Sequence, residues 1–112
     1  MPRLSIRIDL GPGHRLGPGK VRLLETIAEH GSISAAGRAL GMSYRRAWLL
    51  VEAMNRGFDR PVVEAQIGGR AGGGARLSAF GAAVVAQYRA VESAAEAATA
   101  PYLSQLGQAG DL

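Results

Sequence analysis

The chain has 112 residues, of which 47% are hydrophobic and 20% charged, as in one small globular domain, and this argues against a disordered chain. It has no cysteine, which excludes disulfide frameworks, thiolate catalysis and cysteine-based zinc sites, and its formal charge of +4 favours a polyanionic partner. No apolar run of about 18 residues could span a membrane and the amino terminus lacks an apolar signal core, so we expect a cytoplasmic protein.

The first third of the chain predicts a strand and a helix. Hydrophobic and polar residues alternate strictly from Leu4 to Leu10, which indicates a strand with one buried face. A Gly/Pro-rich stretch from Gly11 to Gly19 predicts a turn. A helix is then expected over Lys20–His30, ended by Gly31, with apolar residues at helical spacing: Val21, Leu24, Ile27 and Ala28.

The middle of the chain predicts two helices and a tight turn. A short segment covers Ser32–Leu40, the turn follows at Gly41, and a longer helix runs from Tyr44 to about Arg56. Ser34 and Ser43 each precede a helical run and are predicted to accept hydrogen bonds from its first amides as N-caps.

The last part predicts a hairpin and a long helix. Pro61 ends the helical region, and the order is then a strand at Val62–Ile67, a turn at Gly68–Gly74, a strand at Ala75–Leu77 and a helix over Ala79–Thr99, opened by Ser78. The fold class is therefore α+β, a mainly α winged helix-turn-helix with one extra N-terminal strand. We expect one domain over residues 1–100 and a tail over 101–112; the alternative is another α+β domain with the same element order.

The most informative stretch, Ile33–Glu52, fits a helix-turn-helix. Two helices that cross steeply need small side chains at the crossing, which Ala36 and Gly37 supply, and the turn needs positive φ, which suits Gly41. Each helix also needs apolar anchors on one face. The predicted anchors are Ile33, Ala36 and Leu40 on the first helix and Ala47, Leu50, Val51 and Met54 on the second.

The predicted second helix begins with groups that suit DNA. A recognition helix presents its first residues to the major groove, and here these are Ser43, Tyr44, Arg45 and Arg46. The opposing interpretation is that the arginine pair is a solvated surface and that Tyr44 and Trp48 form a half-buried pair; we favour packing for Trp48. Leu49 points outward on the helical wheel; either it meets a thymine methyl or the phase of the wheel is slightly wrong.

The glycine-rich hairpin predicts a wing with two basic side chains, Arg70 and Arg76. Its glycines do not form a nucleotide-binding loop, because no lysine follows them at the required spacing. His14 and His30 are far apart and are expected to be exposed polar residues, and the carboxylates have no metal-ligand spacing. We therefore expect no catalytic residue, no metal site and no enzyme.

These motifs carry a family resemblance. Gly31-Ser-Ile-Ser-Ala-Ala, Gly41-Met-Ser-Tyr-Arg-Arg-Ala-Trp48 and the stretch from Gly68 to Gly81 closely resemble the N-terminal domain of ModE-type molybdate-responsive transcriptional regulators, which is similar to the LysR-type domain. The resemblance covers about Leu4–Tyr88. It implies a homodimer on a palindromic DNA operator, with DNA contacts from Ser43, Tyr44, Arg45, Arg46, Arg70 and Arg76; Ser32, Ser34 and Leu49 complete the candidate DNA-binding residues.

The chain departs from that family in one respect. Full-length members sense molybdate through C-terminal domains with a Ser-Ala-Arg-Asn-like motif, and no such motif occurs here. We therefore expect no cofactor, and a regulator that stands alone or relies on a separate sensor protein. The competing class of function is a winged-helix protein–protein interaction module that does not bind DNA, favoured by the outward Leu49 and Trp48.

An apolar stripe along the last helix predicts homodimerisation over about residues 78–100. Its members recur at helical spacing on one face, and a small domain has little core left to cover the second half of the stripe. The alternative is that the alanine-rich end is a solvated helix, since alanine forms helices without burial. The candidate dimer contacts are Val84, Tyr88, Val91, Ala95 and Ala98.

Overall fold

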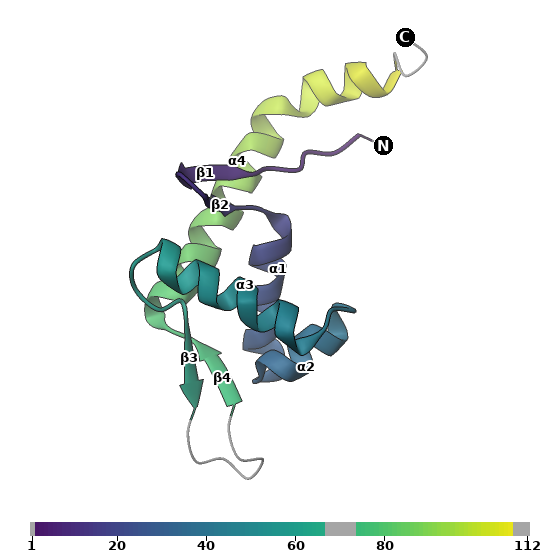
Figure 1. Cartoon of the computed structure of the whole chain (residues 1–112). Helices are drawn as coiled ribbons and strands as arrows, with labels where there is room; N and C mark the ends of the chain where they lie inside the picture. The colour runs from purple at the N-terminus through teal and green to yellow at the C-terminus, as the bar shows by residue number, and fades with distance from the viewer. Residues whose placement is uncertain (1, 67–73, 109–112) are drawn as a thin grey trace.

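The computed structural model describes residues 2–66 and 74–108, which form four helices and two antiparallel hairpins (Figure 1). The predicted α+β winged helix-turn-helix is confirmed. In chain order the elements are β1 (Ile8–Gly11), β2 (His14–Leu16), α1 (Pro18–His30), α2 (Ile33–Ala39), α3 (Tyr44–Gly57), β3 (Val63–Gln66), β4 (Gly74–Leu77) and α4 (Ala79–Gln108).

The N-terminal region contains a hairpin that the sequence analysis missed. The strand expected over Leu4–Leu10 is shorter and lies later, and the stretch predicted as a turn contains its partner β2. Ile8 faces Leu16 and Asp9 faces Arg15, with a register shift before the turn. The residues before β1 follow α4 instead: the Tyr88 hydroxyl donates to the Ile6 carbonyl at 2.7 Å. Without a neighbouring strand to bond to, these residues form no ladder.

Helix α1 is the centre of the hydrophobic core. It ends as predicted at Gly31, whose φ of +78° is left-handed and whose N–H donates to the Ile27 carbonyl at 2.8 Å. The predicted apolar face of this helix included Ala28, which is exposed, and left out Leu23, which is fully buried. The core around α1 contains Leu16, Val21, Leu24, Ile27, Ala36, Ala47, Val51, Met54, Val62, Val63, Ala75, Val84 and Tyr88.

The wing is the hairpin of β3 and β4, and its base is fixed by side-chain hydrogen bonds. Asn55 of α3 accepts from the backbone N–H groups of Val62 and Val63 at 2.8 and 3.4 Å. The Ser78 hydroxyl donates to the Pro61 carbonyl at 2.6 Å and accepts from the N–H of Gly81 at 2.9 Å, so it caps α4 as predicted. The wing is thus held to both α3 and α4.

A partly buried histidine joins the N-terminal hairpin to the end of α3. His14 lies edge-on to Phe58 with ring centroids 4.4 Å apart, and Phe58 lies edge-on to Phe80 at 5.4 Å. Among the described residues nothing hydrogen-bonds the buried Nε2 of His14. The expectation that His14 is an exposed polar residue is therefore wrong, whereas His30 is exposed.

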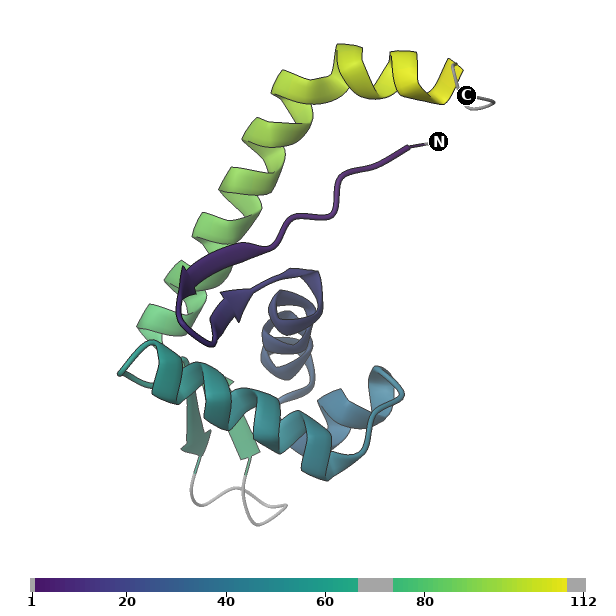
Figure 2. The same cartoon turned by 45° about the horizontal axis from the view of Figure 1, so that its top comes forward.

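Helix α4 is longer than predicted. It does not end at Thr99 but continues through Pro101 to Gln108, so the first eight residues of the predicted tail, 101–108, are helical. Figure 2 shows that the helix changes direction in its C-terminal part, as expected where proline removes a helical hydrogen bond. Within 2–66 and 74–108, no helix has the length and apolar character needed to cross a membrane.

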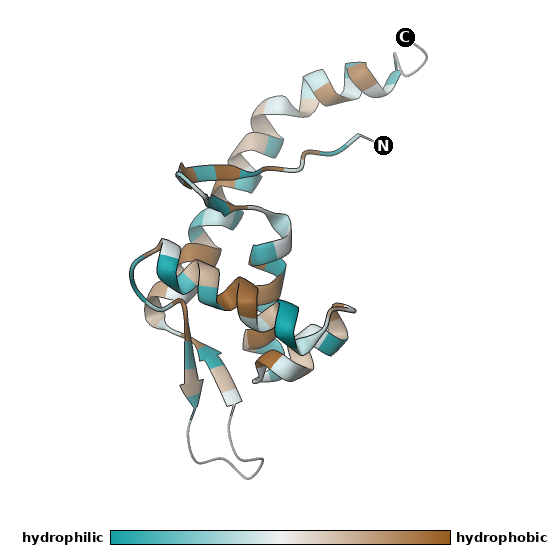
Figure 3. Cartoon of the chain, in the orientation of Figure 1, coloured by the Kyte–Doolittle hydropathy of each residue, from teal (hydrophilic) through white to brown (hydrophobic). Residues whose placement is uncertain are grey.

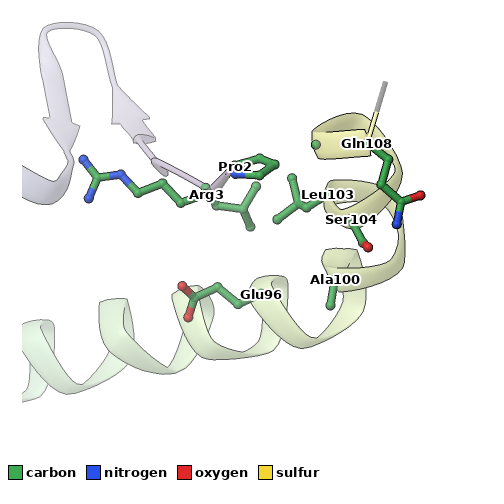
Figure 4. Close-up of a pocket in the computed structure, with 9 residues that line it drawn as sticks. Pro2, Arg3, Glu96, Ala100, Leu103, Ser104 and Gln108 are labelled. Carbon is green, nitrogen blue, oxygen red and sulfur yellow. The ribbon is translucent and has the colours of Figure 1, made fainter. Parts of the chain in front are cut away.

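The two ends of the described chain lie beside each other. A groove of about 510 Å³ separates the N-terminal residues from the end of α4, and Figure 4 shows Pro2 and Leu103 on its facing walls. Farther along α4, Arg89 forms an ion pair with Glu25 of α1 at 2.6 Å and with Glu92 at 2.7 Å. The hydrogen bond from Arg89 lowers the pKa of Glu25. This ion pair and the core fix α4 against α1.

Candidate nucleic-acid interface

The helix-turn-helix is built at the crossing of α2 and α3. A Cβ added at Gly37 would lie 3.3 Å from the Met42 carbonyl oxygen and 3.4 Å from the Ala47 Cβ, so the small residue predicted there lies where the two helices approach closely. In the turn, Gly41 has a φ of +71°, as predicted, and the Met42 N–H donates to the Gly37 carbonyl at 2.9 Å. These contacts set the direction of α3.

Serine side chains cap both helices of the motif. Ser43 accepts from the Arg46 N–H at 3.1 Å and caps α3, which confirms the prediction. The predicted cap at Ser34 is wrong: Ser32 caps α2 by accepting from the Ala35 N–H at 3.0 Å. Ser34 lies inside the helix and accepts from the Arg38 guanidinium at 2.9 Å. Helix α2 therefore begins two residues earlier than the cap predicted at Ser34 implies.

The first two turns of α3 present a polar surface with an apolar end. Ser43, Tyr44, Arg45 and Arg46 are all exposed, and Leu49 is 46% exposed. Around a surface depression of about 270 Å³ lie Ser43, Arg45, Arg46, Leu49 and Leu50. Figure 3 shows this change from the hydrophilic start of α3 to its hydrophobic middle. Within the described part of the chain, no carboxylate lies within 4 Å of either guanidinium.

Trp48 does not pack as predicted. It is 42% exposed, and Tyr44, one turn earlier, is more exposed still. The core side of α3 is filled by small or slender residues, Ala47, Val51 and Met54, which leaves the indole at the border of the helix outside the core. Both aromatic side chains therefore belong to the exposed surface of α3.

The wing carries a basic residue that is already paired. Arg76 on β4 faces Glu64 on β3 in the strand register, and their side chains approach to 3.8 Å. Both are solvent-exposed, so the arginine can exchange this partner for a phosphate. The other predicted wing contact, Arg70, lies outside the described residues.

A second basic groove, which the sequence analysis missed, lies between the N-terminal hairpin and α3. Its volume is about 360 Å³, and four of its lining residues are cations: Arg7, Arg15, Lys20 and Arg46. The alternating pattern before β1 indicates that Arg7 points outward. However, no sequence signal places it near Arg46, because that proximity depends on the missed hairpin.

The predicted dimer stripe on α4 divides into two parts. Val84 and Tyr88 are buried in the chain's own core, which makes them unavailable to a partner. Val91, Ala95 and Ala98 lie beyond that core, and Val91 is 44% exposed. Only this second part of the stripe, which remains a prediction, can face a second copy.

Comparison with known proteins identifies the same region. Residues 19–82 match the model of bacterial regulatory helix-turn-helix proteins of the lysR family, and they include α2, α3 and both described wing strands. The molybdenum-pterin-binding proteins MopA and MopB of Rhodobacter capsulatus are 46% and 49% identical over 80 and 81 residues, covering 71% and 72% of this chain and 30% of each relative.

The molybdenum transport protein ModE of Azotobacter vinelandii is 39% identical over 92 residues, covering 82% of this chain and 33% of that protein. The chain thus spans about a third of the length of these curated relatives. The resemblance to ModE-type regulators is confirmed by these similarities. Because the family model covers more than half of the chain, the chain belongs to the lysR family of bacterial regulatory helix-turn-helix proteins.

Proposed function

We propose that this chain is a sequence-specific, double-stranded DNA-binding transcriptional regulator in which the start of α3 enters the major groove. The observation that carries the proposal is the exposed cluster of two hydroxyls and two guanidiniums, Ser43 to Arg46, on the first turn of the second motif helix. In helix-turn-helix proteins, this is the part of the recognition helix that meets base edges.

Each side chain of the cluster has a chemical role in this proposal. Arg45 or Arg46 can donate two hydrogen bonds to guanine O6 and N7, and the Tyr44 hydroxyl can donate to a phosphate. Leu49, one turn further on, lies where it can contact a thymine methyl. Arg76 on the wing contacts a phosphate and contributes affinity without base preference.

The regulator acts as a homodimer on a palindromic operator, joined through the exposed half of α4. The stripe of Val91, Ala95 and Ala98 continues at helical spacing into the segment after Pro101, where Tyr102 is 69% and Leu106 59% exposed. Large exposed apolar side chains along one helix face favour a partner helix. A two-fold axis there would give two recognition helices for two half-sites.

Sedimentation tests the dimer. We expect the wild type to be dimeric at micromolar concentration and Val91→Glu to be a folded monomer, because a carboxylate would be buried in the interface. Ser93→Glu is the matched control, since Ser93 lies about 200° around α4 from Val91. A monomeric wild type, or a folded Val91→Glu variant that stays dimeric, would contradict the homodimer.

Selection of bound fragments from genomic DNA, followed by salt titration, tests the DNA-binding function. We expect enrichment of one palindromic motif, and binding that weakens by about 0.9 log units per tenfold increase in salt for each phosphate neutralised. Recovery of no common motif would contradict sequence-specific binding, and the absence of binding at low salt would contradict DNA binding altogether.

A protein–protein interaction module is the second candidate function. The exposed Trp48 and Leu49 favour it, since large apolar side chains are enriched in the centres of protein interfaces. The same titration distinguishes the two functions. Binding through an apolar interface would be nearly insensitive to salt, whereas binding through phosphate contacts weakens as salt increases.

Molybdate is not part of the proposed DNA-binding activity of this chain. The names of the relatives MopA, MopB and ModE refer to molybdenum, but the similarity covers only about a third of each relative. We propose that this chain binds DNA without a cofactor. Calorimetry with molybdate and tungstate should give no saturable heat; a stoichiometric micromolar site would contradict this assignment.

A further inference from the structure

The basic groove beside α3 combines charges from separate parts of the chain. Arg7 precedes β1, Arg15 lies in β2, Lys20 is in the first turn of α1, and Arg46 is in α3. Among the described residues, the carboxylate within 4 Å of these cations is that of Asp9, at 3.3 Å from Arg15 and 4.0 Å from Arg7. Four cations against one carboxylate leave a strongly positive groove.

The wall of the groove formed by α1 also favours anions. Gly17 and Gly19 line it, and among the described residues no side chain caps the start of α1. A Cβ at Gly19 would meet nothing within 4 Å, so an incoming group has room to approach the backbone. The first amides of a helix and its dipole both attract negative charge. The start of α1 therefore adds to the attraction that the four cations exert on an anion.

The position of the groove indicates which anion it meets. In Figures 1 and 2 the β1–β2 hairpin and the wing lie on opposite sides of α3. The groove shares Arg46 and Leu50 with the depression at the start of α3, so it continues the candidate DNA-binding surface. A helix in a major groove about 12 Å wide has a phosphate backbone on each side. The wing can reach only one of them.

We propose that this basic groove binds the phosphate backbone on the side of the major groove away from the wing, with Arg15 and Lys20 as its main contacts. The inference rests on the proposed DNA-binding function and extends it to a second flank of α3. Lys20 is held in position because its Nζ donates to the Arg15 carbonyl at 2.8 Å. The contacts are sequence-independent, since phosphates carry no base information.

Salt titration of an Arg15→Gln/Lys20→Gln variant tests the inference. Arg22→Gln is the matched control, because Arg22 is on α1 and lies about 200° around the helix from Lys20. We expect the salt slope of the double variant to fall by about 0.9 for each phosphate that the groove of each protomer no longer neutralises, equally on operator and random DNA. The slope of the control should stay at the wild-type value.

The outcomes separate this inference from the proposed function. If the wild type binds DNA and the folded double variant keeps the wild-type slope, the inference is overturned and the proposed function stands. If the wild type does not bind DNA, both are overturned. Circular dichroism checks the fold. Should the double variant not fold, Arg7→Gln, whose side chain is 63% exposed, replaces it, and the slope should fall by about 0.9 for each protomer bound.

Discussion

The two hairpins on either side of α3 resemble each other in charge and differ in how they are attached. In each, an arginine faces a carboxylate across the strands: Asp9 and Arg15 at 3.3 Å in the N-terminal hairpin, and Glu64 and Arg76 at 3.8 Å in the wing. Both arginines are exposed, and a phosphate can replace their carboxylate partners. The chain thus places the same kind of anion contact on both flanks of α3.

Each hairpin also depends on a glycine at a helix end, but the neighbouring atoms differ. A Cβ at Gly57 would lie 2.5 Å from the His14 imidazole, which is a side chain and not part of the backbone. A Cβ at Gly81 would lie 2.0 Å from the Val62 carbonyl oxygen, which belongs to the backbone at the base of the wing. The wing is therefore the more rigidly attached of the two.

The largest expected effect follows from this difference. Gly81→Ala should lower the free energy of unfolding by about 3 kcal/mol, because the backbone of either α4 or the wing must shift. Gly57→Ala should cost less than Gly81→Ala, since a side chain must shift instead of the backbone and alanine favours the helix by up to about 1 kcal/mol. Denaturant unfolding measures both. Equal losses would show that the two attachments are equally rigid.

The side chain that fastens the wing to α3 gives the next effect. Asn55→Ala should lower the free energy of unfolding by about 1–3 kcal/mol, because the N–H groups of Val62 and Val63 lose their acceptor. Hydrogen exchange of these two amides should accelerate more than that of amides in β2. Unchanged protection of both amides would mean that another group accepts from them.

The carboxylates of the two hairpins give a smaller effect on binding. Glu64→Gln and Asp9→Asn each remove a negative charge that competes with phosphate for the facing arginine. Each should tighten DNA binding by under about 1 kcal/mol and steepen its salt slope, as expected for exposed ion pairs. If Glu64→Gln tightens DNA binding and Asp9→Asn does not, only the wing side of α3 contacts phosphate.

The smallest effect concerns an ion pair outside both flanks. Since Arg89 lowers the pKa of Glu25 below its usual 4.5, the pair stabilises the folded state above that value and loses this contribution as pH falls through the folded pKa. Glu25→Gln should cost under about 1 kcal/mol at neutral pH and nothing in strong acid, because both groups are partly exposed. A difference that grows in acid would contradict this sign. DNA binding should not change.

The two hairpins also show what the sequence could predict. The wing has two β-branched or apolar runs separated by glycines, a pattern that indicates a hairpin on its own. In the N-terminal hairpin, β2 is only His14–Leu16 and lies within a Gly/Pro-rich stretch, so its residues resemble a turn. Its pairing with β1 becomes evident only in the folded structure. The basic groove could not be predicted, because its cations meet only through that hairpin.

Local signals predicted the helix-turn-helix more completely. The positive φ at Gly41, the small residue at Gly37 and the cap at Ser43 are requirements that neighbouring residues impose, and all three are confirmed. The exposure of Trp48 and the continuation of α4 beyond Pro101 depend on what surrounds them. Proline predicts a helix end, yet here the helix bends and continues.

The central claim, that the start of α3 reads base edges, is tested most directly by the base preference of Arg45→Ala. Binding of wild type and variant is measured on the selected operator and on single-base substitutions of it. The account predicts a loss of about 1–3 kcal/mol on the operator and a relaxed preference at one base pair in each half-site. An equal loss on every sequence, with all base preferences retained, would contradict it.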